Sequence, residues 1–406
     1  MFLVLLIFSE AQGQSLWSQF SNTGFIARYG ATSTLVNDKI YVIGGEGKDW
    51  LLNDIQVYDP SVDSWSTVAA QGDFTRHFSH SAVEVGGKIY VIGGVENNID
   101  FADSIWVFDP SNNEWSVVLP LEGTHFTDRY NVACSAIGDN IYMIGGNAGP
   151  LWFVSTVEVF NLNSRIWSTP QVTNDSFHIL ITPKSFVIDG KIYVVGYPLD
   201  PSCHCDVQVY DPQTNVWSIP LTNGMKTPRQ YFAANEINGK IYIMGGEKDG
   251  GGDISTTEVY DPQSRTWSLF PTDGTFTARY YLGSNVIGNK IFTMDGQQAQ
   301  TTYLSTTEVL TIGSNTVVDA GGGKLSYNHR IYPDPASNIL NLVSGETPSK
   351  FQIIDIMGRV VLSGMTLDHA TLSIDISTLA KGIYYVLVNN PWGYPVEAGK
   401  VAIIGK

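Results

Sequence analysis

The most regular feature of the sequence is a short apolar strand pattern ending in two glycines, which recurs over residues 39–296. Its first copy is Lys39–Gly45, where four apolar residues stand between a lysine and the glycine pair. The aromatic residue of the pattern recurs every 49 to 52 residues, at Tyr41, Tyr90, Tyr142, Tyr193, Tyr242 and Phe292. An interval of this length indicates repeated supersecondary units, none of which can bury its apolar face alone.

Each unit predicts four antiparallel strands. An apolar run such as Ala82–Val85 precedes the glycine-ended strand, and the two are joined by Asn, Asp or Gly pairs that tolerate the positive φ of a tight hairpin. A third strand, Ile55–Pro60 in the first unit, ends in Asp-Pro, and Trp65 follows its turn residue Asp59 by six residues. The alternation of β-branched and aromatic residues between turns favours strands, and we expect no long amphipathic helix in this region.

The strand count predicts a closed ring. Six glycine-ended strands are followed by only five fourth strands that carry a tryptophan, and the last unit stops at Thr306–Val309 without one. An unmatched tryptophan, Trp17, lies ahead of the first unit. We therefore expect the N-terminal strand to complete the last sheet, which would remove the exposed edges of an open array.

Together these features resemble the kelch-repeat β-propeller family. The double glycine, the Val-Tyr-Asp-Pro motif and the spaced tryptophan match that family's repeat over residues 16–310. The resemblance implies an all-β, six-bladed propeller closed by its N-terminal strand, which we assign to residues 14–310. Tyr197 follows Gly196 in the fourth unit and the sixth unit has lost one glycine, so we expect these two sheets to be irregular.

The pattern changes beyond the repeats. Residues 311–328 predict a flexible linker, and short strands within residues 329–406 favour a small Ig-like β-sandwich. This last segment resembles the C-terminal sorting domain of type IX secretion cargo from Gram-negative Bacteroidota in Tyr332–Ala336, Ile374–Leu379 and Gly382–Tyr385. The resemblance implies Sec export, contact with the type IX machinery, and a secreted or surface-attached product. The strands alone leave an Ig-like adhesive module open.

Composition and charge agree with export. Met1–Phe8 is apolar but too short to cross a bilayer, and Ala11–Gly13 supplies the small residues of a signal-peptidase site, so we assign residues 1–13 to a signal peptide. No other stretch is a transmembrane candidate. The chain has 39 acidic and 23 basic residues, a formal net charge of -16, and no basic stripe. Nucleic acid is therefore disfavoured as a partner.

Candidate functional groups gather on one predicted face. Loops between the second and third strands and loops between sheets share this side, which we call the loop face, and variable loops on a rigid scaffold commonly carry recognition. An arginine recurs there with aromatic or histidine neighbours. Its copies would attract carboxylates or sulfates around the axis, although a residue in every repeat also fits a structural role between sheets. The candidate binding residues of this set are Arg28, Arg76, His77, Arg129, Arg229 and Arg279.

Two tryptophans, Trp50 and Trp152, are candidates of another kind because neither follows the repeat interval. Each lies in a predicted loop of the loop face, where an indole can stack on a sugar ring, anchor a partner protein, or fold back as a lid over its sheet. These residues favour a binding module for an extracellular glycan or protein.

Metal and catalytic sites receive less support. Cys203–Cys205, with His204 between the cysteines, has metal-binding residue types but no second ligand pair, so a local disulfide or free thiols are favoured. Asp249–Asp253 lacks a full calcium ligand set, and we predict no metal and no cofactor. No catalytic motif occurs, so no catalytic residue is assigned. The alternative function is a carbohydrate-active enzyme, such as a sugar-acid mutarotase or lyase, with His77, His125 or His178 as base.

Overall fold

A computed structural model describes residues 15–96, 100–101, 104–149, 152–172, 177–203, 205–312, 330–332, 338–343, 350–355, 360–365, 371–389 and 395–403. The chain divides into two compact units, Gly13–Ser314 and a unit that includes Asn315–Lys406, and each is described by itself. The predicted signal peptide, residues 1–13, and nearly all of the predicted linker, residues 311–328, lie outside the described residues. Those two assignments stay predictions.

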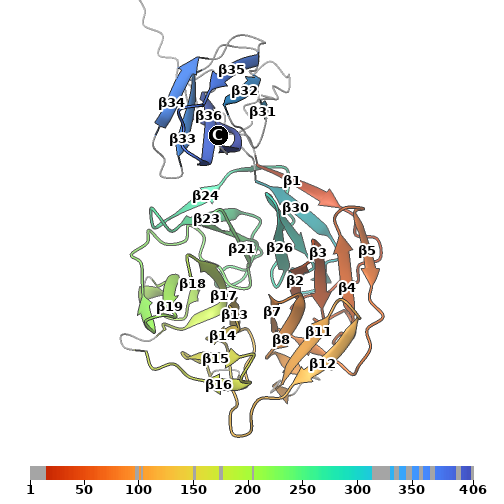
Figure 1. Cartoon of the computed structure of the whole chain (residues 1–406). Coiled ribbons are helices and arrows are strands. Elements are labelled where there is room, and N and C mark those ends of the chain that lie inside the picture. The colour runs from red at the N-terminus through yellow and green to blue at the C-terminus, as the bar shows by residue number, and fades with distance from the viewer. Residues whose placement is uncertain are drawn as a thin grey trace, which may run out of the picture. The chain divides into compact units, whose positions relative to one another are not determined.

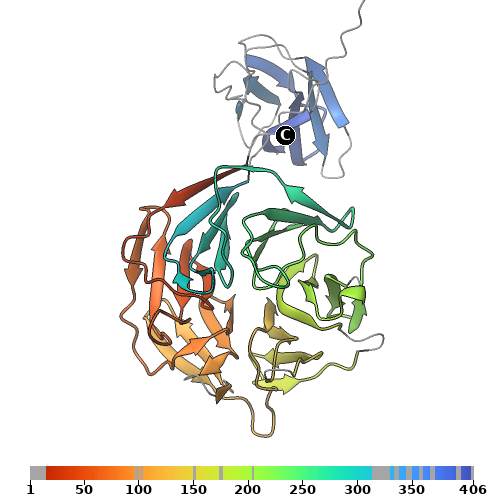
Figure 2. The ribbon, with the colours of Figure 1, turned by 180° about the vertical axis from the view of Figure 1, so that it is seen from behind.

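The first unit consists of six antiparallel sheets, the blades, arranged around a common axis (Figure 1; Figure 2). The strands of blades one to three are β2 (Thr32–Val36), β3 (Lys39–Ile43), β4 (Ile55–Asp59) and β5 (Ser64–Thr67); β7 (Ser81–Val85), β8 (Lys88–Ile92), β11 (Ile105–Asp109) and β12 (Glu114–Val118); and β13 (Ala133–Ile137), β14 (Asn140–Ile144), β15 (Val157–Asn161) and β16 (Ile166–Ser168).

Blades four to six continue the ring. Their strands are β17 (Leu180–Ile188), β18 (Lys191–Pro198), β19 (Val207–Asp211) and β20 (Val216–Ser218); β21 (Ala233–Ile237), β22 (Lys240–Met244), β23 (Thr257–Asp261) and β24 (Thr266–Phe270); and β26 (Gly283–Ile287), β27 (Lys290–Met294), β30 (Thr307–Thr311) and β1 (Ser15–Phe20). The first-named strand of each blade lies next to the axis and contacts the equivalent strands of both neighbouring blades.

The N-terminal strand closes the ring, as the strand count predicts. Strand β1 pairs antiparallel with β30, with Trp17 opposite Leu310, and a short strand, β25 (Thr272–Asp273), runs parallel on its outer side. The sixth blade is therefore built from both ends of the propeller sequence, and its outermost long strand is not left unpaired.

The apolar core lies between blades. Six clusters of buried side chains each combine residues from two neighbouring blades, so the repeats stabilise one another rather than folding separately. The tryptophans that follow the repeat interval are at most 8% exposed. They stack on aromatic rings: the centroids are 4.0 Å apart for Phe25 and Trp65 and 4.1 Å apart for Phe74 and Trp115.

The two departures from the repeat have different outcomes. In the fourth blade, β18 continues through Pro198 because no second glycine turns the chain, and the pairing with β17 shifts register between Ile181 and Lys184. In the sixth blade, β26 and β27 keep a regular register, because Asp295 adopts the left-handed φ of 54° that the missing glycine would have had. The expected irregularity is present in the fourth sheet and absent from the pairing of these two strands.

Five two-residue strands among the described residues lie on the loop face, outside the four-stranded blades. They are β6 (His77–Phe78), β9 (Val95–Glu96), β10 (Asp100–Phe101), β28 (Gln297–Gln298) and β29 (Thr302–Tyr303). The turn η1 (Pro201–Cys203) is the one helical element in the described part of the chain. Over those residues no helix is long and apolar enough to cross a membrane.

The C-terminal unit has two sheets. One contains β31 (Arg330–Tyr332), β32 (Ile339–Val343) and β35 (Thr371–Asp375), and the other contains β34 (Val360–Met365), β33 (Lys350–Asp355), β36 (Gly382–Asn389) and β37 (Pro395–Ile403). Buried residues of both sheets, such as Leu340, Ile374 and Val386, share one core. Two sheets around one core agree with the predicted sandwich, whereas its Ig-like character stays a prediction.

Candidate functional site

The glycine pair joins each blade to the next at the inner edge of the loop face. The Gly45 N–H donates to the carbonyl of His77 in the following blade at 2.8 Å. Gly44 has a φ of 63°, and a Cβ there would lie 2.7 Å from the same carbonyl oxygen. In this blade the pair is therefore required, because the main chain of the next blade approaches too closely for a larger residue, whereas the sixth blade accepts Asp295 at the first position.

Four of the candidate arginines lie inside their own blades and are 0% exposed. Arg229 is representative: it donates to the Gly245 carbonyl at 3.0 Å and to Glu258 Oε1 at 2.6 Å. A guanidinium with no exposed surface does not contact a ligand at the axis. The prediction that the arginines attract carboxylates or sulfates there is therefore wrong for these four, which have a structural role instead. Their side chains bind within the blade, and hydrogen bonds to a neighbouring blade use main-chain groups: the Arg28 carbonyl accepts from the Gly296 N–H, and the Arg28 N–H donates to the Leu304 carbonyl. The four are Arg28, Arg129, Arg229 and Arg279.

His77, not Arg76, occupies the arginine position of the second blade. His77 Nδ1 lies 3.0 Å from the Thr75 carbonyl, two residues back, and Arg28 Nε donates to the Ile26 carbonyl in the same way at 3.1 Å. His77 is 0% exposed, and burial lowers the pKa of its imidazole, so it is neutral at pH 7. Arg76 is exposed, one residue out of register.

In the fourth blade, which lacks the arginine, the glutamate that pairs with it in the fifth blade is replaced as well. The buried Arg229 and Glu258 form an ion pair in the fifth blade. In the fourth blade Leu180 stands at the arginine position, and Gln208 replaces the glutamate; its amide donates to the His178 carbonyl at 2.8 Å. Neither blade keeps one member of the pair as an unpaired charge, and in the first blade, where Gln56 stands at the glutamate position, Arg28 pairs with Asp54 instead. This is expected if the pair is structural.

One residue of each blade adopts a left-handed conformation where the blades meet the axis, with φ between 46° and 64°. The Asn131 N–H donates to the Ser79 carbonyl at 2.9 Å, the Tyr281 N–H to the Tyr231 carbonyl at 2.8 Å, and the Tyr231 N–H to Thr182 Oγ1 at 2.9 Å. These bonds run from blade to blade and fix the main chain around the opening. We call this set the mouth ring: Gly30, Ser79, Asn131, Thr182, Tyr231 and Tyr281.

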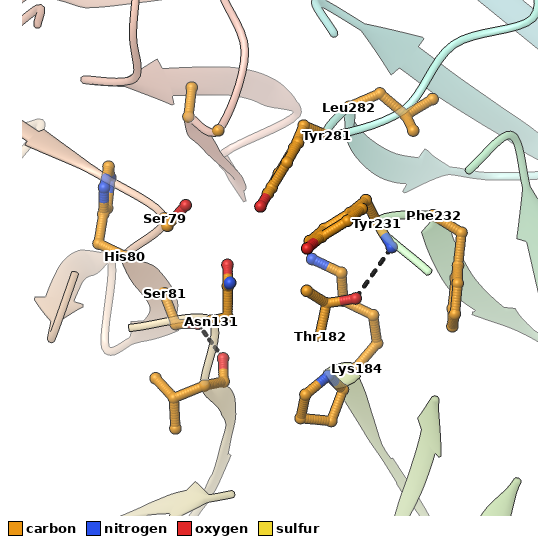
Figure 3. A pocket seen from close by; sticks show the side chains of 14 residues that line it. Ser79, His80, Ser81, Asn131, Thr182, Lys184, Tyr231, Phe232, Tyr281 and Leu282 are labelled. Carbon is orange, nitrogen blue, oxygen red and sulfur yellow. Dashed lines mark hydrogen bonds between the residues drawn. The ribbon is translucent and has the colours of Figure 1, made fainter. Parts of the chain in front are cut away.

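The mouth ring surrounds a pocket of about 50 Å³, which shares lining residues with an axial channel of about 290 Å³. Figure 3 shows the side chains of Asn131, Tyr231, Tyr281 and Lys184 directed toward a common centre. The rings of Tyr231 and Tyr281 stack with centroids 4.0 Å apart. Polar and aromatic groups from four blades thus converge at the end of the axis.

A cluster of tyrosines extends this pocket over the loop face. The Tyr29 ring lies 5.5 Å from those of both Tyr281 and Tyr303, and its hydroxyl donates to Glu46 Oε2 at 2.6 Å. Burial raises the pKa of Tyr280 to about 12, and its hydroxyl donates to Gln297 Oε1. These hydroxyls are protonated at neutral pH and can act as donors.

Trp50 and Trp152 lie at corresponding places in the first and third blades, in the loops β3–β4 and β14–β15, and are 60% and 68% exposed. Their carbonyls accept hydrogen bonds from Gly47 N–H at 3.0 Å and Ala148 N–H at 2.8 Å, so the main chain at each loop tip is held. Neither indole is buried as a lid would be. Both indoles are exposed to solvent at loop tips.

The cysteine motif forms a disulfide between Cys203 and Cys205, one of the interpretations that the sequence left open. The ligand atoms of His178 and these two cysteines all lie within 4.8 Å of one another. Disulfide sulfurs are not thiolates, so a metal at this place would require reduction first.

The three histidines considered as bases do not share a cavity. His77 is buried, whereas His125 and His178 are exposed and line different hollows, beside Trp167 and beside Cys203 respectively. The described residues therefore contain no pocket that unites them. A histidine-centred enzyme site stays a prediction without a geometric counterpart.

Comparison with known proteins identifies the repeats. The family described as the KLHDC2/KLHL20/DRC7 Kelch-repeats domain matches residues 10–146 and 147–319. This chain belongs to the kelch-repeat family. A Secretion system C-terminal sorting domain matches residues 330–395, so the kelch propeller carries a type IX sorting domain and is exported to the cell surface or secreted.

The relatives of this kelch propeller include one protein named as an enzyme and others named for their kelch repeats. An N-(sulfonatooxy)prop-2-enimidothioate sulfolyase from Thlaspi arvense is 28% identical over 239 residues, covering 52% of this chain and 68% of that protein. Kelch repeat and BTB domain-containing protein 12 of Danio rerio is 26% identical over 240 residues, with 52% of this chain and 36% of that protein covered. Kelch-like protein 23 of Mus musculus is 27% identical over 215 residues, with 51% and 36% covered.

The sequence showed part of the site of the kelch propeller. The aromatic residues next to the arginines, such as Tyr29 and Tyr281, are the sequence signal for the tyrosine cluster. Lys184 was missed because it lies in the register shift of the irregular fourth blade. The interval of 13 residues from Arg28 to Tyr41, repeated from His77 to Tyr90, could have placed His77 correctly.

Proposed function

We propose that the protein is an exported binding module whose ligand, an extracellular glycan or protein, is contacted on the loop face by Trp50, Trp152 and the tyrosine cluster. The observation that carries this proposal is the contrast between two kinds of tryptophan. Those that follow the repeat are at most 8% exposed, whereas Trp50 and Trp152 are 60% and 68% exposed at held loop tips.

Exposed indoles of this size are costly to leave in water and effective in binding. Covering the exposed part of one such ring removes roughly 150 Å² of apolar surface, which corresponds to about 3–5 kcal/mol before the costs of association. Tyrosine and tryptophan also lose few rotamers on binding, so the loop face combines large contact area with small entropy loss. This chain covers only 36% of each of the two relatives that are named for their kelch repeats, so the partners of those proteins do not transfer to it.

A glycan array and a screen against surface proteins, with the full-length chain, test the proposal. For the ligand that is found, Trp50→Ala and Trp152→Ala are expected to weaken affinity by at least about tenfold each, as for a central aromatic contact. Val62→Ala is the matched control: Val62 is 66% exposed in the turn between β4 and β5, on the opposite face. If both tryptophan variants bind like the control, the loop tips are not the contact.

A second function, an enzyme, is favoured by one observation, the similarity to the sulfolyase over 52% of this chain. On this hypothesis the axial channel would hold the substrate, since Lys184 and His80 line it. Incubation with N-(sulfonatooxy)prop-2-enimidothioate and detection of released sulfate tests this directly. Absence of turnover would remove the support that this similarity gives to an enzyme.

A further inference from the structure

The axial channel is lined by residues from all six blades, and five of the blades contribute a serine or an asparagine. The serines and asparagines among them are Ser33, Ser81, Ser185, Ser284, Asn235 and Asn285. A volume of about 290 Å³ exceeds what a single ordered water needs, and its lining is not that of a dry apolar cavity. The channel and the pocket at the mouth share Lys184 and His80. They therefore form one continuous site.

Lys184 is the one formally charged side chain among the described residues that line the mouth and the channel. Its side chain is exposed to the solvent of the mouth, and no described carboxylate forms an ion pair with it. The ammonium is therefore available as the counter-charge of an anionic group that enters the mouth.

Asp295 is the acid whose negative charge would attract the Lys184 ammonium, but it carries little of that charge at neutral pH. Its side chain is 0% exposed, and burial raises its pKa to about 8. It accepts a hydrogen bond from the Gly283 N–H at 2.6 Å, and its other oxygen has no partner among the described residues. The carboxyl is mostly protonated at pH 7, so the Lys184 charge is not neutralised from within.

Two more groups at the mouth lack partners. The Ser79 hydroxyl and both ring nitrogens of His80 are buried without a hydrogen-bond partner in the described structure. The Ile43 carbonyl lies near enough to favour the charged imidazole slightly, yet burial and His77 lower the pKa of His80 to about 3. A neutral imidazole, a free hydroxyl and an ammonium facing one cavity are suited to an occupant rich in oxygen atoms.

We propose that the mouth and channel bind the carboxylate or sulfate group of an acidic sugar, with Lys184 as its counter-charge and the hydroxyls of Tyr231 and Tyr281 and the amide of Asn131 as further donors. The side chains that Figure 3 shows converging provide these donors. The stacked tyrosines present ring surface to a sugar, and the ring of polar groups suits its hydroxyls. The proposal rests on the glycan-binding form of the proposed function and names its ligand class.

Calorimetric titration of the full-length chain with glucuronate, glucose and acetate tests this. Glucuronate is expected to bind, and glucose and acetate to bind at least about tenfold more weakly, because each lacks one of the two recognised parts. Lys184→Gln should lower glucuronate affinity at least about tenfold, the loss expected for one charge-assisted hydrogen bond. Lys248→Gln, which removes an exposed lysine from a loop of the same face, should leave the affinity unchanged.

The outcomes separate the two proposals. If glucuronate fails to bind, or binds Lys184→Gln as well as the unaltered protein, the acidic-sugar site is wrong, even where neutral glycans bind through Trp50 and Trp152. If acetate binds as tightly as glucuronate, the site takes an ion and the sugar assignment is wrong. If glucuronate binding depends on Lys184 while the tryptophan variants change nothing, the inference holds and the loop tips are excluded. Tyr281→Phe, which keeps the ring, should also weaken glucuronate binding.

Discussion

Replacing Arg229 by leucine should destabilise the fifth blade far more than an average substitution. Arg229 and Glu258 are both 0% exposed, and the guanidinium also donates to the carbonyls of Gly245 and Thr256 at 3.0 and 2.8 Å. Arg229→Leu leaves the Glu258 carboxylate in the interior with only the backbone N–H groups of Lys226 and Thr227 as donors. The expected loss is about 3–5 kcal/mol of unfolding free energy, the cost of breaking a buried ion pair.

The fourth blade supplies the compensating change. There Leu180 and Gln208 occupy the two positions, so the double variant Arg229→Leu with Glu258→Gln copies a combination that this protein already folds with. Removing both charges should recover at least about 2 kcal/mol relative to the single variant. The remaining loss of about 1–2 kcal/mol reflects carbonyls that lose their guanidinium donor.

Urea unfolding followed by tryptophan fluorescence measures these differences, because every tryptophan except Trp392 lies in the propeller sequence. Arg76→Leu, at an exposed arginine, is the control and should change the unfolding free energy by less than about 0.5 kcal/mol. The argument is refuted if Arg229→Leu costs no more than the control. It is also refuted if the double variant is as unstable as the sum of the two single variants.

Two further predictions concern the blade interfaces. Gly245→Ala should lower the unfolding free energy by about 2–4 kcal/mol, because its Cβ would lie 2.7 Å from the Arg279 carbonyl oxygen. Gly288→Ala has a similar φ but nothing within 4 Å of its Cβ, so it should cost only about 1 kcal/mol. Equal losses in urea unfolding would contradict the close approach. The other prediction concerns Asp295, whose pKa is raised to about 8 by burial, so that the folded state holds a proton that the unfolded state releases. The unfolding free energy should therefore fall as the pH rises from about 4 to about 8, by up to about 1.4 kcal/mol per pH unit. Asp295→Asn should remove this contribution, and an unchanged slope would show that Asp295 is not protonated in the folded protein.

The sequence was informative wherever a residue has one physical role that repeats. The glycine pairs, the tight turns and the tryptophans each recur at a fixed interval, so six blades and closure through Trp17 could be predicted and were found. The arginines recur at one position in four of the six blades, yet recurrence does not distinguish a buried ion pair from a row of binding groups. That distinction depended on burial, which only the folded structure provides.

The site itself was less predictable, because it arises where the repeat is broken or where blades meet. Lys184 enters the axial channel next to a register shift between Ile181 and Lys184, and no pattern of residues announces such a shift. Asp295 replaces a glycine, which suggested only a degraded repeat. Trp50 and Trp152 were found because they depart from the interval, and the structure places both at exposed loop tips.

The mouth ring has a consequence for how such a protein can acquire a new ligand. Its main chain is fixed by bonds between neighbouring blades, so the side chains mounted on it contribute little to holding the frame. Thr182 is the exception, because its hydroxyl is itself a link in the ring. The other five positions supply only main-chain groups to the ring, so their side chains can be exchanged where the new residue tolerates a left-handed φ, and Tyr231 and Tyr281 remain coupled by their stacking. Recognition at the axis can therefore diversify without a change in the fold that presents it.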